Sequence, residues 1–166
     1  MDKEIFELSE QLGRELQERE MVVATAESCT GGWISQALTM VPGSSAWFER
    51  GFVTYTNRSK QEMLGVRSST LERDGAVSEL SAREMAEGAL ARSDANCSVA
   101  VSGVAGPDGG SPEKPVGTVW LALASAGHVT EARRLRLPGD RDAVRRQTVI
   151  VALQALIDLV RRPQSA

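Results

Sequence analysis

The stretch MVVATAESCTGGWISQAL, residues 21–38, contains the pattern that decides the fold. Its first six residues form a short, apolar, partly β-branched run, which is typical of a buried strand. The run leads into ESCTGG, residues 27–32, and the apolar residues after it recur at helical spacing. The stretch therefore predicts a strand, a tight turn and a helix, which is the repeating unit of an α/β domain.

The flanking sequence predicts the remaining elements. Further strands are predicted over residues 51–56, 97–103, 116–125 and 128–137, the last two as an antiparallel pair. An amphipathic helix over residues 3–19 precedes the first strand, with Asp2 as its cap, and Pro42 and Gly43 end the second helix. Three more helices are predicted: one around Lys60 capped by Asn57, one opened by Ser81 and Glu84 with Ser78 as an alternative cap, and a terminal one capped by Asp140. Residues 65–77 are predicted to be loop.

Helices before, between and after five strands predict an α/β fold, a single three-layer α/β/α domain with a mixed, mostly parallel five-stranded sheet. A chain of 166 residues suits one domain, so we expect residues 1–166 to fold together, with residues 162–166 as a flexible tail.

Composition restricts the function classes. A net charge of −3 gives no basic footprint for nucleic acid, so no nucleic-acid partner is expected. The sequence has neither a signal peptide nor a run of about 20 apolar residues, so we expect a cytoplasmic protein without membrane contact. Cys29 and Cys97 lack metal-ligand spacing, so no metal and no cofactor are expected.

Two turns after predicted strands suit an anionic ligand. In the first, Ser28, Thr30, Gly31 and Gly32 lie at a helix start, where free backbone N–H groups attract phosphate. The alternative is that Thr30 is an ordinary N-cap, and on this motif alone that interpretation is favoured.

The second turn is SGVAGPDGG, residues 102–110. Its small residues Gly103, Ala105 and Gly106 allow a ligand to approach the backbone closely. The alternative is a flexible connection, and the dinucleotide fingerprint GxGxxG is absent. Ligands collect at the carboxyl ends of strands in open α/β sheets, so two such turns together favour a binding site.

A third segment, GSSAWFERGFVTYTNRSKQ over residues 43–61, contains candidate groups for serine chemistry. Ser45 at a short helical turn is a candidate nucleophile, and Tyr55 and Lys60 follow it. Because the chain has a single histidine, His128, a group other than histidine would have to take the proton, and Lys60 is a candidate. The pKa of the lysine would then have to fall from about 10.4 to about 7–8. This shift corresponds to roughly 4 kcal/mol, which burial of the amine would have to impose. The alternative is a surface lysine and a structural tyrosine.

Five blocks of sequence decide between these interpretations by resemblance. TAESCTGGWIS, PGSSAWFERGFVTYTNRSKQEMLGV, GAVSE, VSGVAGPDGGSPEKPVGTVW and GDRDAVRRQ together resemble the CinA C-terminal domain family, from about residue 8 to residue 156. The resemblance implies a Ser/Lys amidohydrolase that converts nicotinamide mononucleotide to nicotinate mononucleotide and ammonia in pyridine-nucleotide salvage. Larger CinA proteins place another domain ahead of this one, and we expect its activity to be absent here.

The resemblance also implies roles for individual residues. Ser45 would be the nucleophile, Lys60 the general base and Tyr55 a supporting hydroxyl, although chemistry alone does not separate Ser45 from Ser44. The phosphate would lie against one of the two glycine turns, with Arg141 or Arg145 of GDRDAVRR as a clamp. Solvated arginines on a terminal helix are the alternative for that pair.

Two other function classes stay open at this point. One is a non-catalytic nucleotide-binding or regulatory module with the same glycine turns. The other is a competence or DNA-damage partner, which the acidic composition disfavours. We expect a small-molecule nucleotide as ligand and a homo-oligomer, with a dimer as the first choice.

Overall fold

The structure is a computed structural model, and it describes residues 1–163. Its elements in chain order are α1 (Lys3–Glu18), β1 (Val23–Glu27), α2 (Trp33–Thr39), the 3-10 helix η1 (Ser44–Ala46), β2 (Phe48–Val53), α3 (Asn57–Leu64), α4 (Ser68–Asp74), α5 (Glu79–Ala91), β3 (Cys97–Gly103), β4 (Thr118–Ser125), β5 (Glu131–Arg136) and α6 (Arg141–Arg161).

The five strands form one mixed sheet in the order β2-β1-β3-β4-β5. Strand β1 pairs in parallel with β2 and β3, whereas β4 pairs antiparallel with β3 and β5. Only β4 therefore runs against the other four strands, which confirms the predicted mixed, mostly parallel sheet. The carboxyl ends of β1, β2 and β3 consequently meet at one edge.

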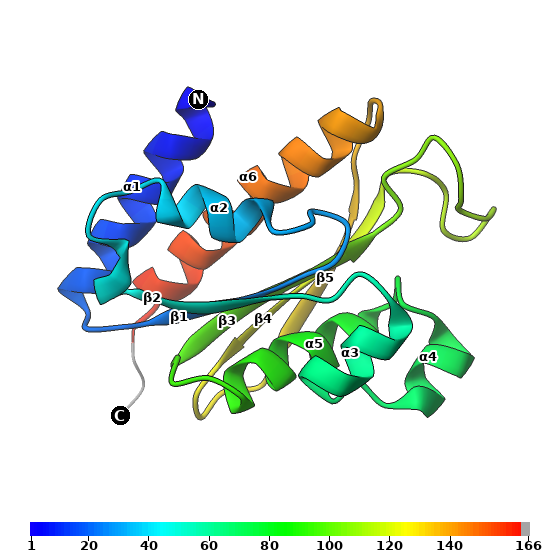
Figure 1. Ribbon diagram of the computed structural model, residues 1–166, viewed down its shortest axis with the longest axis horizontal. Coiled ribbons are helices and arrows are strands. Elements are labelled where there is room, and N and C mark those ends of the chain that lie inside the picture. Colours follow the sequence, from blue (N-terminus) through cyan, green and yellow to red (C-terminus); the bar gives the residue numbers. More distant parts are fainter. Residues whose placement is uncertain (164–166) are drawn as a thin grey trace.

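Helices cover both faces of the sheet (Figure 1). Helices α1, α2 and α6 pack on one face around a core that includes Leu12, Ile34 and Leu153. Helices α3, α4 and α5 cover the other face around a smaller core that includes Leu64 and Met85. The predicted three-layer α/β/α architecture is confirmed.

Two of the predicted segments differ from the structure: the strand predicted over residues 51–56 lies three residues earlier, and a segment predicted as loop contains a helix. Strand β2 ends at Val53, earlier than predicted, because its last partner in β1 is Glu27, where β1 itself ends. Helix α4 lies within residues 65–77, which were predicted as loop. It buries only Thr70 and Leu71, so the sequence has no apolar stripe there that would reveal a helix.

The caps were predicted with mixed success. Asp2 and Asp140 cap α1 and α6 as expected, since each side chain accepts a hydrogen bond from the backbone three residues later. Thr56 caps α3 in place of Asn57, and Ser78, the alternative cap, opens α5 in place of Ser81.

Two features of the chain bear on its ends and on membranes. Of the tail predicted over residues 162–166, residues 164–166 lie outside the described part of the chain, whereas Arg162 donates hydrogen bonds to Glu131. Among residues 1–163, no helix has the length and apolar character needed to cross a bilayer.

Candidate active site

A pocket of about 190 Å³ lies at the edge where β1 and β3 end. Residues from all three polar segments of the sequence line it, together with the start of α6: Ser28, Cys29, Tyr55, Asn57, Lys60, Ala76, Val77, Ser102, Gly103, Ala105 and Arg141. Six of the predicted site residues are therefore brought together, namely Ser28, Tyr55, Lys60, Gly103, Ala105 and Arg141.

Lys60 and Ser28 form the chemical centre of this pocket. Lys60 lies on α3 and its side chain is 1% exposed. Its Nζ lies 2.9 Å from Ser28 Oγ and 2.6 Å from the carbonyl oxygen of Thr54. A hydroxyl and an amine at this distance have the geometry of a nucleophile and its base.

Burial is what makes Lys60 suitable as a base. Removal from water lowers the pKa of its amine from 10.5 to about 8, and only a weak opposing influence of Cys29 raises it. In the described part of the chain no carboxylate forms an ion pair with Lys60. A fraction of the amine, about one tenth, is therefore neutral at pH 7.

Cys29 lies beside Ser28 but has a different character. Burial raises the pKa of its thiol to about 11, so the thiol stays protonated at neutral pH. The thiolate is the nucleophilic form of cysteine. Ser28 differs from Cys29 in that its hydroxyl has the Lys60 amine within hydrogen-bond distance.

A buried carboxylate, Glu27, holds the turn in place. Its two oxygens accept hydrogen bonds from Thr30 Oγ1 at 2.7 Å, from the backbone N–H of Ile34 at 2.8 Å, and from both the backbone N–H and the hydroxyl of Ser35 at 2.9 and 2.7 Å. The carboxylate thus accepts hydrogen bonds from amides at the start of α2 that have no partner within the helix. Its negative charge also interacts favourably with the positive N-terminal end of the helix dipole.

This arrangement bears on one of the two expected phosphate sites, the turn of Thr30, Gly31 and Gly32. The Thr30 hydroxyl donates to Glu27, and two of the first amides of α2 bind the same carboxylate. Gly31 and Gly32 have φ of +60° and +104°, so they serve the turn, with Gly32 as the N-cap residue. The backbone N–H groups of Trp33, Ile34 and Ser35 are therefore already bound within the protein.

The structure does not bring Ser45, the predicted nucleophile, to Lys60. It is exposed in η1, just before β2 begins, whereas Lys60 bonds to Thr54 just after β2 ends. Six residues of strand separate the two positions, which is roughly 20 Å. The partner of Lys60 is Ser28, which the sequence placed only among the substrate-binding residues.

Two arginines of α6 reach the site by different routes. Arg141 donates to the carbonyl oxygen of Gly106 at 2.9 Å and to the Tyr55 hydroxyl at 3.0 Å. Arg145 donates to the carbonyl oxygens of Cys29 and Thr30 at 3.0 and 3.1 Å. Tyr55 is thus bound to Arg141 and not to Lys60, and its side chain is 60% exposed at the pocket mouth.

A cavity of about 520 Å³ adjoins the pocket. The two share Ala105 and Arg141, and the rest of the cavity is lined by Pro107, Val116, Gly139, Asp140, Asp142 and Arg145. Arg141 therefore lies at the boundary between the pocket and the cavity.

Several residues of the site were missed in the sequence. Glu27 stood inside the ESCTGG motif, but a buried carboxylate that caps the next helix has no distinctive spacing. Ala76 and Val77 line the pocket from the segment GAVSE, and Ser102 donates to the Ala76 carbonyl at 2.9 Å. The GAVSE segment was noted for its resemblance alone, and that was the signal that could have found these residues.

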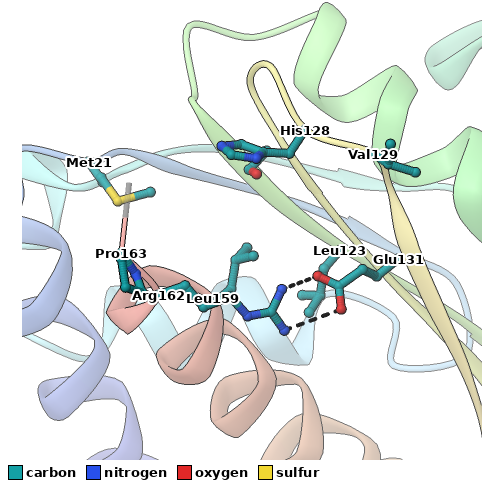
Figure 2. A pocket seen from close by; sticks show the side chains of 9 residues that line it. Met21, Leu123, His128, Val129, Glu131, Leu159, Arg162 and Pro163 are labelled. Carbon is teal, nitrogen blue, oxygen red and sulfur yellow. Dashed lines mark hydrogen bonds and ion pairs between the residues drawn. The ribbon is translucent and has the colours of Figure 1, made fainter. Parts of the chain in front are cut away.

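Another pocket, of about 330 Å³, lies at the opposite end of the molecule (Figure 2). Its lining contains Met21, Leu123, His128 and Leu159, beside the ion pair of Arg162 with Glu131. It contains none of the predicted site residues. Among residues 1–163 no cluster of three or more His, Cys, Asp or Glu side chains has the arrangement of a metal site.

Comparison with known proteins gives the family. The profile of the CinA C-terminal domain matches residues 5–160. The chain belongs to the CinA C-terminal domain family. It is 57% identical over 155 residues to the nicotinamide-nucleotide amidohydrolase PncC of Escherichia coli strain K12, covering 93% of this chain and 94% of that protein. It is 56% identical over 155 residues to the Pseudomonas putida protein of the same name, covering 93% and 96% of the two chains.

Longer relatives and solved structures belong to the same family. A putative competence-damage inducible protein of Symbiobacterium thermophilum is 54% identical over an alignment of 154 residues that covers 88% of this chain and 36% of that protein. The crystal structure of competence/damage inducible protein CihA from Agrobacterium tumefaciens has a TM-score of 0.93 at 48% identity, covering 96% of this chain and 97% of that one. The fold described above is therefore the fold of this family.

Proposed function

We propose that this protein hydrolyses the carboxamide of nicotinamide mononucleotide to nicotinate mononucleotide and ammonia, as an enzyme of pyridine-nucleotide salvage. The observation that carries the proposal is the distance of 2.9 Å between Lys60 Nζ and Ser28 Oγ in a buried pocket. The names of relatives that are 56–57% identical over nearly the whole chain supply the substrate.

The mechanism follows from the positions of the Ser28 hydroxyl and the Lys60 amine beside the substrate. Ser28 Oγ attacks the carboxamide carbon while neutral Lys60 takes the hydroxyl proton, so a C–O bond forms and a tetrahedral oxyanion develops. Lys60 then returns the proton to the amide nitrogen, the C–N bond breaks, and ammonia leaves an ester on Ser28. Water, deprotonated by Lys60, hydrolyses that ester and frees Ser28.

The oxyanion is stabilised by backbone amides of the turn. Within residues 1–163, no other residue accepts a hydrogen bond from the N–H groups of Cys29 and Thr30, while the Cys29 N–H contacts its own thiol. The amide that directly follows a nucleophile is a common oxyanion donor, and preorganised donors of this kind are worth about 10²–10³-fold in kcat. These two N–H groups form the proposed oxyanion hole.

Arg141 is the proposed contact to the anionic part of the nucleotide. It is exposed at the boundary between the pocket and the adjoining cavity. With the nicotinamide ring beside Ser28, the ribose and phosphate extend past this guanidinium, which binds phosphate oxygens in bidentate fashion. Tyr55 fixes Arg141 through its hydroxyl, 3.0 Å from Nη2.

The reaction is tested by ammonia release from nicotinamide mononucleotide. We expect Ser28→Ala to lose at least about 10³-fold in kcat, because it removes the nucleophile and almost no volume. Ser45→Ala is the matched control and should retain wild-type turnover, since Ser45 is exposed in η1.

Two outcomes would contradict this proposal. An active Ser28→Ala enzyme together with an inactive Ser45→Ala enzyme would return the nucleophile to η1. A wild-type protein that binds the nucleotide but releases no ammonia would instead be a nucleotide-binding or regulatory module.

We also propose that the protein acts in the cytoplasm as a homodimer. Phosphorylated nucleotides are cytoplasmic metabolites, and three large hydrophobic side chains, Val53, Tyr55 and Met63, are at least 40% exposed at and beyond the end of β2. Light scattering of the purified protein measures the mass, and a monomer at micromolar concentration would contradict the dimer.

A further inference from the structure

Arg141 and Arg145 each donate through two nitrogens to the protein, but of the two it is Arg145 that bonds to the turn after β1. It reaches from α6 to the turn after β1, where Nε lies 3.0 Å from the Cys29 carbonyl oxygen and Nη2 lies 3.1 Å from that of Thr30. Its guanidinium carbon lies 5.5 Å from the centroid of the Trp33 ring. Two of its three nitrogens and one face of the guanidinium are therefore already engaged by the protein.

The two carbonyls belong to the peptides that carry the amides of the turn. The Cys29 carbonyl and the Thr30 N–H share one planar trans peptide and point in opposite directions. A guanidinium that holds this carbonyl on the α6 side keeps the Thr30 N–H facing away from α6. Helix α3, which carries Lys60, covers the opposite face of the sheet (Figure 1).

The second peptide of the turn is held as well. The Thr30 carbonyl, bound to Arg145, shares its peptide with the N–H of Gly31, which donates to the Ser28 carbonyl at 3.0 Å. Glu27 fixes the same turn from its side chain through Thr30 Oγ1. Arg145 and Glu27 thus leave the peptide planes between Ser28 and Gly31 little freedom to rotate.

We propose that Arg145 is a positioning residue for the oxyanion hole and not a ligand of the substrate phosphate, an inference that rests on the proposed amide hydrolysis. Arg145 acts through the peptide between Cys29 and Thr30, whose N–H, that of Thr30, faces the developing oxyanion, and it also holds the next peptide of the turn. Arg141, four residues earlier on the same helix, is exposed at the mouth of the pocket and contacts the nucleotide. Arg145 therefore contributes to turnover, and Arg141 contributes to affinity for the nucleotide.

Steady-state kinetics on nicotinamide mononucleotide separate the two roles. Arg145→Met keeps the length of the side chain and removes its donors. We expect its kcat to fall by about 10–100-fold, a part of the effect of losing an oxyanion donor, with KM changed by less than about threefold. Its Kd for the product, nicotinate mononucleotide, should stay at the wild-type value, which also shows that the variant is folded. Arg141→Met, the matched variant, should raise KM and the product Kd and change kcat little.

Other variants keep the test decisive if Arg145→Met fails to fold. Lysine keeps the charge but has no fork to bridge two carbonyls, so Arg145→Lys should lose kcat as well. Added guanidinium should restore part of the kcat of Arg145→Ala. A normal kcat in Arg145→Met or Arg145→Lys, or a loss confined to KM and product Kd, would overturn the positioning role while leaving the amidohydrolase proposal intact. A wild-type protein without ammonia release would overturn both.

Discussion

Lys60 illustrates how one residue carries the chemistry of this site. Its side chain is 1% exposed and contacts the Ser28 hydroxyl and the Thr54 carbonyl, so its charged form is desolvated without a counter-charge. Desolvation is the largest cause of its lowered pKa, which is about 8. The same burial that makes a charged lysine unfavourable therefore produces a base that is partly neutral under ordinary conditions.

The lowered pKa predicts how activity depends on pH. The neutral amine is the active form, so kcat/KM should rise with pH through about 8 and then level off, well below the ordinary lysine value of 10.5. Lys60→Arg should lose at least about 10³-fold in kcat, since a guanidinium keeps its proton near neutral pH. Rates of both proteins between pH 6 and pH 10 check this. An active Lys60→Arg enzyme, or a rate independent of pH in this range, would show that Lys60 acts only by its charge.

The sequence predicted which residues lie in this site better than it predicted which of them contact each other. Lys60, Tyr55, Arg141 and the glycine turns were all predicted, because each stands in a recognisable block. Ser28 and Lys60 are 32 residues apart and meet only because β1 and β2 lie side by side in parallel. The contact between Ser28 and Lys60 depends on the order of the strands in the sheet. Ser45 was favoured as the nucleophile by resemblance and by its nearness to Lys60 along the chain.

At the scale of elements, close packing of α5 against α3 supports the position of Lys60. A Cβ at Gly88 of α5 would lie 2.0 Å from the carbonyl oxygen of Leu64, the last residue of α3. The same carbonyl accepts a hydrogen bond from Arg92 at 3.1 Å. The absence of a side chain at Gly88 thus allows the end of α3, one turn beyond Lys60, to rest directly on α5.

Gly88→Ala should therefore destabilise the protein in spite of the better helix propensity of alanine. Propensity favours alanine by about 0.5–1 kcal/mol, whereas overpacking a close helix contact costs typically about 1–3 kcal/mol. We expect a net loss in the free energy of unfolding, measured in urea, and a lower kcat because α3 is displaced. Glu87→Ala, at an exposed neighbouring position, is the control and should be close to neutral. A Gly88→Ala protein more stable than wild type would show that the two helices separate easily.

The elements themselves were predictable where their apolar periodicity was strong. Helices α1 and α6, and β3 and β4, have buried residues at regular spacing and were placed close to their observed bounds. Helix α4 has no such stripe, and the choice between Ser78 and Ser81 as a cap depends on contacts with Gly75 that the sequence does not display. Local chemistry therefore predicts an element well only when burial repeats along it.

At the scale of the whole molecule, α1 and α6, which pack on the same face of the sheet, are joined by ion pairs near their N-terminal ends. Asp2 caps α1 by accepting from the Ile5 N–H at 3.2 Å, and it also accepts from Arg146 of α6 at 2.6 Å. Arg146 donates in addition to Glu4 at 2.9 Å. Because α6 also carries Arg141 and Arg145, this contact connects the N-terminal helix to the helix that reaches the active site.

This contact predicts a stability that depends on pH. The hydrogen bond from Arg146 lowers the pKa of Asp2 below its ordinary value of 3.8. A carboxyl with a lowered pKa stabilises the fold fully above its ordinary pKa, and the contribution is lost as pH falls through the folded-state pKa. Asp2→Ala should cost about 1 kcal/mol or more at pH 7, because it removes the cap as well as the ion pair. Asp2→Asn keeps a capping oxygen and should cost less, since a partly exposed ion pair contributes little.

Denaturation of wild type, Asp2→Asn, Arg146→Met and the double variant at pH 7 isolates the coupling between the two side chains. We expect a small positive coupling at pH 7 that shrinks below about pH 4, as Asp2 becomes protonated. Activity should change little in all three variants, because Arg146 contacts only α1 while Arg141 and Arg145 face the site. A coupling that persists in strong acid would mean that Asp2 and Arg146 interact without the charge of Asp2. A large loss of kcat in Arg146→Met would mean that the packing of α6 against α1 determines the position of the oxyanion turn.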